Sequence, residues 1–163
     1  MKGVTCFLKN PASNPSIGFY LGYTYRRASQ WFGHALKPYD ITPEQWLVLY
    51  RIWEHEGLNQ KEVAAKADKD QPTTTRILDL LEKKGYTRKT VSPHDRRAFQ
   101  LYLTETGKQL IDATAEIERE CGRQIIEGID SRQLELFWDT LSRINDNLQH
   151  LQNNRRDSLH EPE

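Results

Sequence analysis

The sequence has few cysteines, no excess charge of either sign and no long hydrophobic run. Its 163 residues contain only Cys6 and Cys121, so neither a disulfide framework nor a zinc site is expected. No apolar run approaches the roughly 18 residues of a membrane-spanning helix. The stretch MKGVTCFLKNPASNPS also has no apolar segment typical of a secretory signal. We therefore expect a cytoplasmic protein with no membrane partner.

Motifs typical of enzymes are missing as well. No nucleophile elbow, glycine-rich phosphate loop or pair of histidine ligands on one helix is found. The histidines are scattered along the chain, at His34, His55, His94, His150 and His160. We expect no catalytic activity, no metal site and no cofactor.

The charges that are present are unevenly distributed. The composition of 28% charged and 37% hydrophobic residues is typical of one globular domain with a modest core. Residues 1–68 carry 8 basic and 6 acidic groups, residues 69–97 carry 8 and 4, and residues 98–163 carry 7 and 13. The net charges of +2, +4 and −6 sum to zero. A basic middle segment can bind phosphates although the whole chain is neutral.

Helix-start signals divide the chain into several helices. Thr42 with Gln45 and Asn59 with Glu62 have the spacing of capping boxes, and Asp70 is a further N-cap candidate. Thr104 and Asp130 are placed to begin two longer helices. From these signals we predict an irregular arm over 1–15, a first helix within 16–38, a compact region over 39–104, C-terminal helices over 105–154 and a disordered tail over 155–163.

Between Gly85 and Thr104 the hydrophobic period changes from helical to alternating. The segments YTRKTV and FQLYL are rich in β-branched and aromatic residues and enclose the polar stretch SPHDRRA. This pattern predicts a β-hairpin with a charged tip. The fold class is therefore mainly α with one small β-hairpin.

The helix that begins after Asp70 has two unlike sides. At about 100° per residue its apolar side comprises Thr74, Ile77, Leu78 and Leu81. The opposite side comprises Pro72, Arg76, Asp79 and Lys83. A short helix followed closely by a second helix is typical of a helix-turn-helix, whose second helix reads the major groove of DNA. Small threonines permit close approach to DNA and an arginine suits guanine, although capping and solvation explain the same residues taken singly.

The predicted hairpin adds a second basic group, which comprises Arg88, Lys89, Arg96 and Arg97. A charged, narrow hairpin after a groove-reading helix can reach an adjacent minor groove. Asp95 is unexpected there, because an acid at such a tip repels phosphate. We interpret Asp95 as a support that orients an arginine, Arg97, by a charge-assisted hydrogen bond; the alternative is an ordinary turn-forming aspartate.

These segments resemble the MarR family of bacterial winged helix-turn-helix repressors. The resemblance spans about residues 42–111 and is most specific in TTTRILDLLEKKGYTRK and DRRAFQLYLTETG. It implies a homodimer on a near-palindromic double-stranded DNA operator. It also implies a recognition helix that presents Gln71, Thr73, Thr75 and Arg76, and a wing whose Arg97 enters the minor groove with support from Asp95.

Dimerisation is also expected from the last helix itself. Its apolar side chains follow steps of four and three residues, a heptad pattern of Phe137, Leu141, Ile144, Leu148 and Leu151. A small reading head cannot cover this strip, and an exposed strip would form a large apolar patch. We expect the N- and C-terminal helical regions to form the dimer interface.

The resemblance also raises the question of a signal. Members of this family respond to small, often phenolic, anions in a cleft between the dimer helices and the reading head, and others sense oxidants through a cysteine. Candidate effector residues here are Trp31, His34, Trp46 and Tyr50, although aromatic residues at helical spacing also form cores. Cys6 is the redox candidate. A third reading is a winged helix that binds another protein rather than DNA, which the partly outward Leu80 would favour.

Overall fold

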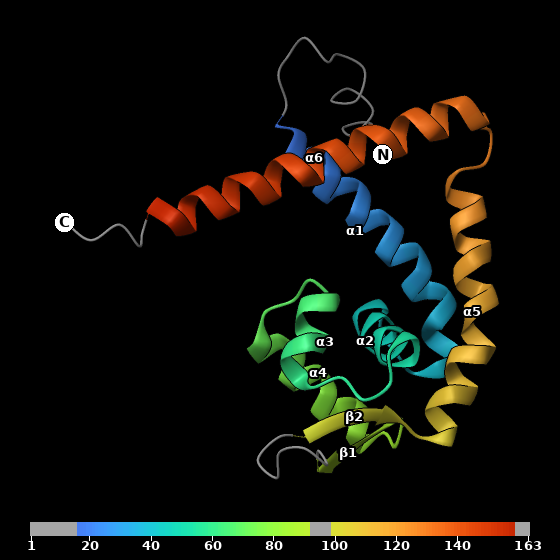
Figure 1. Ribbon diagram of the computed structural model, residues 1–163. Helices are drawn as coiled ribbons and strands as arrows, with labels where there is room; N and C mark the ends of the chain where they lie inside the picture. Colours follow the sequence, from blue (N-terminus) through green and yellow to red (C-terminus); the bar gives the residue numbers. More distant parts are fainter. Residues whose placement is uncertain (1–15, 92–98, 159–163) are drawn as a thin grey trace. The chain divides into compact units, whose positions relative to one another are not determined.

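The computed structural model describes residues 16–91 and 99–158. The elements in chain order are α1 (Ile17–Leu36), the 3-10 turn η2 (Lys37–Tyr39), α2 (Pro43–Glu54), α3 (Gln60–Lys66), α4 (Gln71–Lys83), β1 (Thr87–Val91), β2 (Phe99–Leu103), α5 (Glu105–Ile125) and α6 (Ser131–Ser158). The chain divides into two compact units, Met1–Ile125 and Ile126–Glu163. Figure 1 shows α2, α3, α4 and the hairpin gathered together within the first unit, with α1 beside α5. The mainly helical fold with one small hairpin is as predicted.

The predicted caps begin the helices of the first unit. The backbone N–H of Gln45 donates to Thr42 Oγ1 and the Gln45 side chain accepts from the N–H of Thr42, both at 3.2 Å. Asn59 and Glu62 make the same reciprocal pair at 3.0 and 2.8 Å. Each capping box satisfies two backbone donors that the helix itself leaves free. Gly85, at φ +77°, ends α4 in the left-handed conformation that favours glycine.

The core of the first unit lies between α2, α3, α4, the hairpin and the start of α5. Each of these elements contributes buried side chains to the core. They include Leu49, Ile52, Val63, Leu78, Leu81, Leu101, Leu103 and Ile111. The burial of each such side chain stabilises the fold by about 1.5–3 kcal/mol. This core fixes the position of α4, which carries the predicted reading surface.

The hairpin is a two-stranded antiparallel sheet. Thr87 pairs with Leu103 and Val91 with Phe99, so the register is continuous over five residue pairs. The backbone of the α2–α3 connection adds a short bridge, because Gly57 N–H donates to Leu101 O at 3.0 Å and Leu101 N–H donates to Leu58 O at 2.9 Å. Main-chain bonds therefore attach the middle of β2 to the α2–α3 connection.

The start of α5 packs closely against the residues that follow α4. The Thr104 hydroxyl donates to Gly85 O at 2.6 Å, and Thr104 Oγ1 also accepts from the N–H of Gly107 at 3.0 Å. A Cβ at Gly107 would stand 2.1 Å from Tyr86 O, so only glycine fits this approach of helix to backbone.

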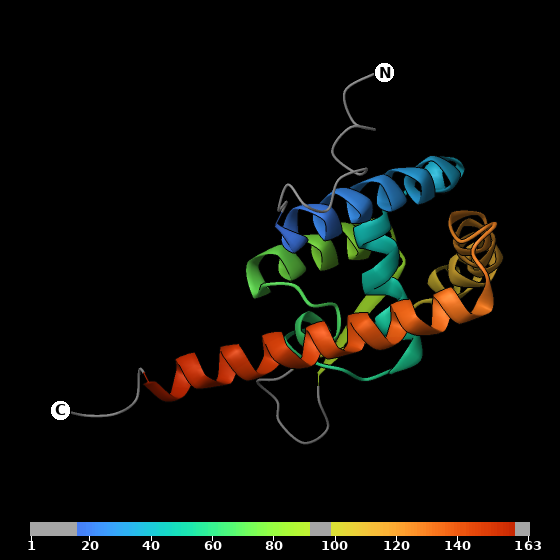
Figure 2. The same cartoon turned by 90° about the horizontal axis from the view of Figure 1, so that it is seen from above.

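The two terminal helical segments leave apolar side chains exposed. Among the residues of α1, only Leu36 is buried, whereas Ile17 is 60% and Phe19 55% exposed. The continuous helix α6, red in Figure 2, exposes Leu136, Phe137, Trp138, Leu148 and Leu151. Leu141 and Ile144 are half-buried. Over residues 16–91 and 99–158, no helix is long and apolar enough to cross a membrane.

Candidate nucleic-acid interface

The helices α3 and α4 are joined by a tight connection in which Asp68 has the left-handed φ of 49°. Asp70 then begins α4: its carboxylate accepts from the Thr73 N–H and the Thr73 hydroxyl, both at 2.8 Å. The hydrogen bond from the Thr73 backbone N–H is the main cause that lowers the pKa of Asp70 below its usual 3.8. The entrance of α4 is thus held in one conformation by an ionised cap.

The two sides of α4 differ as the sequence predicts. The side toward the core comprises Thr74, Ile77, Leu78 and Leu81. The exposed side comprises Gln71, Pro72, Thr73, Arg76, Asp79, Leu80, Glu82 and Lys83, with Leu80 at 41%. Within the described part of the chain, neither Arg76 nor Lys83 forms a hydrogen bond or ion pair. Their donors remain available to an external acceptor such as a phosphate or a base edge.

Thr75 differs from the other predicted contact residues. Its hydroxyl donates to Gln71 O at 2.8 Å and accepts from the side-chain amide of Gln60. Gln60 is the first residue of α3, so this bond joins the two helices of the helix-turn-helix. Thr75 therefore helps to hold α3 and α4 together, a role that its position on α4 alone does not reveal.

The described part of the hairpin holds two cations in different ways. The Arg88 guanidinium lies over the Tyr102 ring, 4.9 Å from its centroid, on the exposed surface. Lys89 Nζ lies 3.1 Å from Asp79 Oδ1 and 2.9 Å from Glu82 Oε2, and the hydrogen bond with Glu82 is the first cause that raises the pKa of Lys89. Sequence reasoning places Lys89 in the basic group but misses this pairing with α4. Asp95, Arg96 and Arg97 lie outside the described residues.

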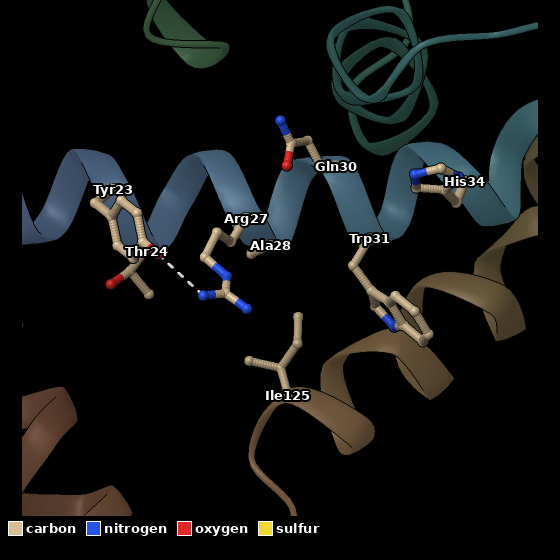
Figure 3. Close-up of a pocket in the computed structure, with 8 residues that line it drawn as sticks. All are labelled: Tyr23, Thr24, Arg27, Ala28, Gln30, Trp31, His34 and Ile125. Atoms are coloured by element: carbon tan, nitrogen blue, oxygen red, sulfur yellow. Dashed lines mark hydrogen bonds between the residues drawn. The ribbon is translucent and has the colours of Figure 1, made fainter. Parts of the chain in front are cut away.

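The predicted effector residues divide into two sets. Trp31 and His34 both line two neighbouring pockets between α1 and α5, with volumes of about 590 and 420 Å³. Figure 3 shows Arg27 and Trp31 pointing from α1 toward Ile125 of α5. Arg27, which sequence reasoning does not select, donates to the Tyr23 hydroxyl at 3.0 Å. Arg27 lies four residues after Tyr23 and four before Trp31, so all three share one side of α1. This spacing could have identified Arg27 from the sequence.

The other set lies along α2. Trp46 is 7% exposed, and its indole N–H donates to Thr114 Oγ1 at 2.8 Å. Tyr50 stacks on Trp46 with ring centroids 5.0 Å apart. Neither residue lines the two pockets between α1 and α5, so the structure does not bring all four candidates to one cavity.

The two cysteines also differ. Cys6 lies outside the described residues. Cys121, on α5, is 7% exposed, and burial is the main cause that raises the pKa of its thiol. A raised pKa leaves less of the reactive thiolate near neutral pH.

A tight helix pair followed by a β-hairpin, with an exposed polar side on the second helix, defines a winged helix-turn-helix protein. The model of the MarR family matches residues 41–99, which hold α2, α3, α4 and β1. The chain belongs to the MarR family of transcriptional regulators.

Solved structures agree over most of the chain. A MarR transcriptional regulator from Methanosarcina mazei Go1 is 29% identical, with a TM-score of 0.74 over 83% of this chain and 97% of that one. The transcriptional repressor CouR, solved bound to a 23-mer DNA duplex, is 27% identical, with a TM-score of 0.72 over 79% and 92%. A Listeria innocua Clip11262 protein of unknown function is 31% identical, with a TM-score of 0.63 over 80% and 91%.

Proposed function

We propose that this protein is a sequence-specific, double-stranded DNA-binding transcriptional regulator that acts as a repressor. The observation that carries the proposal is the exposed side of α4, where Arg76 and Lys83 have no partner in the described chain and the buried side is fixed in the core. A helix held this rigidly can present its N-terminal residues to base edges in a major groove. That a similar repressor is solved on a DNA duplex supports the proposal.

Each residue of the surface has a chemical role in this proposal. The Arg76 guanidinium offers paired donors that match the acceptors of guanine. Gln71 and Thr73 stand in the first turn of α4, where the Gln71 amide can meet base edges or phosphates and the Thr73 hydroxyl, whose proton goes to Asp70, can accept from a base edge. Lys83 and Arg88 supply charge for phosphates. Arg96 and Arg97, with Asp95 as support, complete the proposed wing contact.

We further propose that the regulator binds DNA as a homodimer. The exposed apolar side chains of α6 and of the N-terminal half of α1 are the surfaces that an identical partner would cover. A two-fold dimer places its two α4 helices about 34 Å apart, which selects a near-palindromic operator with half-sites one helical turn apart. Light scattering at several concentrations tests the dimer directly.

The decisive experiment compares two arginine substitutions on DNA taken from the region upstream of the gene. Arg76→Ala removes an unpaired arginine of α4, and we expect an operator affinity lower by about tenfold to a hundredfold. Arg119→Ala is the control, because it removes the same charge from an exposed ion pair with Glu116 on α5. Equal affinities of the two variants would contradict the proposed reading surface.

Salt dependence provides an independent measurement. If each subunit neutralises about four phosphates, the slope of log affinity against log salt concentration should be about −7. Binding that hardly responds to salt would refute a phosphate-based interface. A winged helix that binds another protein would instead bind no operator. Leu80 is the feature that favours this alternative, but the neighbouring exposed positions Arg76, Asp79 and Lys83 are all charged.

For the signal, we propose release from DNA by a small aromatic anion in the α1–α5 pockets. Trp31 offers a ring face, and Arg27 with His34 offers donors for a carboxylate or phenolate. A benzoate-type anion should dissociate the operator complex, and Trp31→Ala should require a higher anion concentration. Trp53→Ala, at a tryptophan of similar exposure outside these pockets, is the control. Equal response of both variants would exclude this pocket.

A further inference from the structure

Lys89 lies on the face of the hairpin that points toward α4, and its side chain is 30% exposed. Successive residues of a strand point to opposite faces, so Lys89 shares a face with Thr87, which is 3% exposed. In the register of the hairpin Lys89 stands opposite Leu101, which is 2% exposed. Because Lys89 itself is not buried, its ammonium lies at the edge of this face, within reach of α4.

The partner of the Lys89 ammonium is supplied by α4. Asp79 and Glu82 are three residues apart and therefore lie next to each other on the helix surface. The Lys89 ammonium lies between them, 3.1 Å from Asp79 Oδ1 and 2.9 Å from Glu82 Oε2. Two of its three donors are thus used on one helix. Lys89 differs in this from Arg76 and Lys83, whose donors find no acceptor in the described chain.

The two carboxylates have no evident purpose on a surface that meets DNA. Asp79 lies on the exposed side of α4, together with Arg76 and Lys83, and its side chain is 60% exposed. An acid there repels phosphate. Its contact with Lys89 offers a structural reason for its presence, because the pair joins the recognition helix to the strand that carries the wing.

We propose that Lys89 is a positioning residue for DNA binding, which fixes the wing relative to α4 through Asp79 and Glu82 rather than by touching DNA. The inference rests on the proposed function, because it concerns how two DNA-contacting elements keep one spacing. A dimer must place two helices and two wings on one duplex, so an error in this spacing occurs twice in each complex.

The central experiment uses a double variant for which simple charge attraction and our proposal predict opposite changes in operator affinity. Asp79→Asn with Glu82→Gln removes two negative charges from each subunit, and simple attraction to phosphate would then tighten binding. If the two acids hold Lys89, the double variant binds operator about fivefold to tenfold more weakly instead. Lys89→Met weakens binding equally, and the triple variant is no weaker than Lys89→Met alone. Tighter binding by the double variant overturns the proposal.

A salt titration separates positioning from direct contact. If Lys89 met a phosphate, Lys89→Met would reduce the salt slope by about 0.9 for each subunit. A positioning residue leaves the slope unchanged, and a reduced slope therefore overturns the proposal. Lys108→Met is the matched control, because Lys108 forms an exposed ion pair with Glu56 at 3.0 Å and lies on neither α4 nor the hairpin. It should bind operator as the unchanged protein does.

A measurement without DNA keeps this inference distinct from the proposed function. In Lys89→Met, hydrogen exchange of the β1 and β2 amides should be about fivefold faster, while exchange in α2 stays the same. Unchanged exchange in the hairpin overturns the role of Lys89 even if Arg76→Ala abolishes operator binding. If exchange is faster but the protein binds no DNA, the role of Lys89 in holding the hairpin is supported and the proposed function as a DNA-binding regulator is overturned.

Discussion

The helices α4 and α6 both carry apolar side chains, but they differ in how far they bury them. In α4 the apolar residues Ile77, Leu78 and Leu81 are at most 8% exposed. In α6 the large apolar residues, Phe137 and Leu148 among them, are about half exposed. The hydrophobic effect therefore stabilises α4 within a single chain, whereas α6 retains apolar area that association with another surface can bury. On the exposed side of α4 only Leu80 is a large apolar residue, whereas α6 exposes at least five.

The same substitution in the two regions tests this difference most strongly. Leu49→Ala leaves a cavity in the core of the first unit and should lower the free energy of unfolding by about 2–5 kcal/mol at every protein concentration. Leu148→Ala should change the stability of the isolated chain by less than about 0.5 kcal/mol but shift the monomer–dimer equilibrium toward monomer.

Urea denaturation at several protein concentrations, with light scattering in parallel, measures both quantities. A large loss of stability for Leu148→Ala at concentrations where the protein is monomeric would show that α6 is not a free apolar surface.

Gly107 offers a second and somewhat smaller test of how closely the first unit is packed. Gly107→Ala forces a Cβ to within 2.1 Å of Tyr86 O, and we expect a loss of about 3 kcal/mol because backbone atoms must separate. Gly122→Ala on the same helix meets no atom within 4 Å and should stabilise α5 by about 0.5–1 kcal/mol. Thermal unfolding of both variants gives the comparison, and similar melting temperatures would contradict it.

Local signals in the sequence predict most of the fold. Thr42, Asn59 and Asp70 cap helices through bonds to residues three positions later. The change of hydrophobic period at the hairpin spans only a few more residues. Both signals can therefore be recognised without knowledge of the tertiary structure. The polar side of α4 follows from the helical period alone, and its exposure is confirmed.

Contacts between distant residues could not be predicted in this way. Trp46 is a candidate effector residue from its helical spacing, but its indole N–H donates to Thr114, 68 positions away, a contact that the spacing does not reveal. The sequence places Lys89 in the basic group of the hairpin, but its ion pairs with Asp79 and Glu82 of α4 appear only in the structure. Thr75 stays a predicted DNA contact, and the bond of its hydroxyl to Gln60 of the neighbouring helix could not be predicted. In each case the partner is set by packing, which no periodicity encodes.

Thr114 provides a third test, with an effect smaller than that of a core cavity. Thr114→Val keeps the shape of the side chain but removes the acceptor of the buried Trp46 N–H, and we expect a loss of about 1–2 kcal/mol. Thr140→Val is the counterpart in α6, where an exposed hydroxyl donates to Leu136 O at 2.7 Å, and its effect should be near zero. Urea denaturation measures both, and Thr114→Ser should recover much of the loss. Equal effects of the two valine substitutions would contradict the contrast between a closed core and an open helix.

The smallest expected effect is a dependence of stability on pH from the cap of α4. The pKa of Asp70 is lowered below 3.8 because its carboxylate accepts the Thr73 N–H and hydroxyl donors. A lowered pKa in the folded state means that the stabilisation is present above about pH 3.8 and is lost as the pH falls through the folded pKa. Asp70→Asn keeps a capping side chain that does not titrate. The melting temperature of the unchanged protein should therefore exceed that of Asp70→Asn near neutral pH, and this difference should shrink in acid. A difference that stays constant from about pH 6 to about pH 3 would show that the charge of Asp70 contributes nothing to holding the entrance of α4.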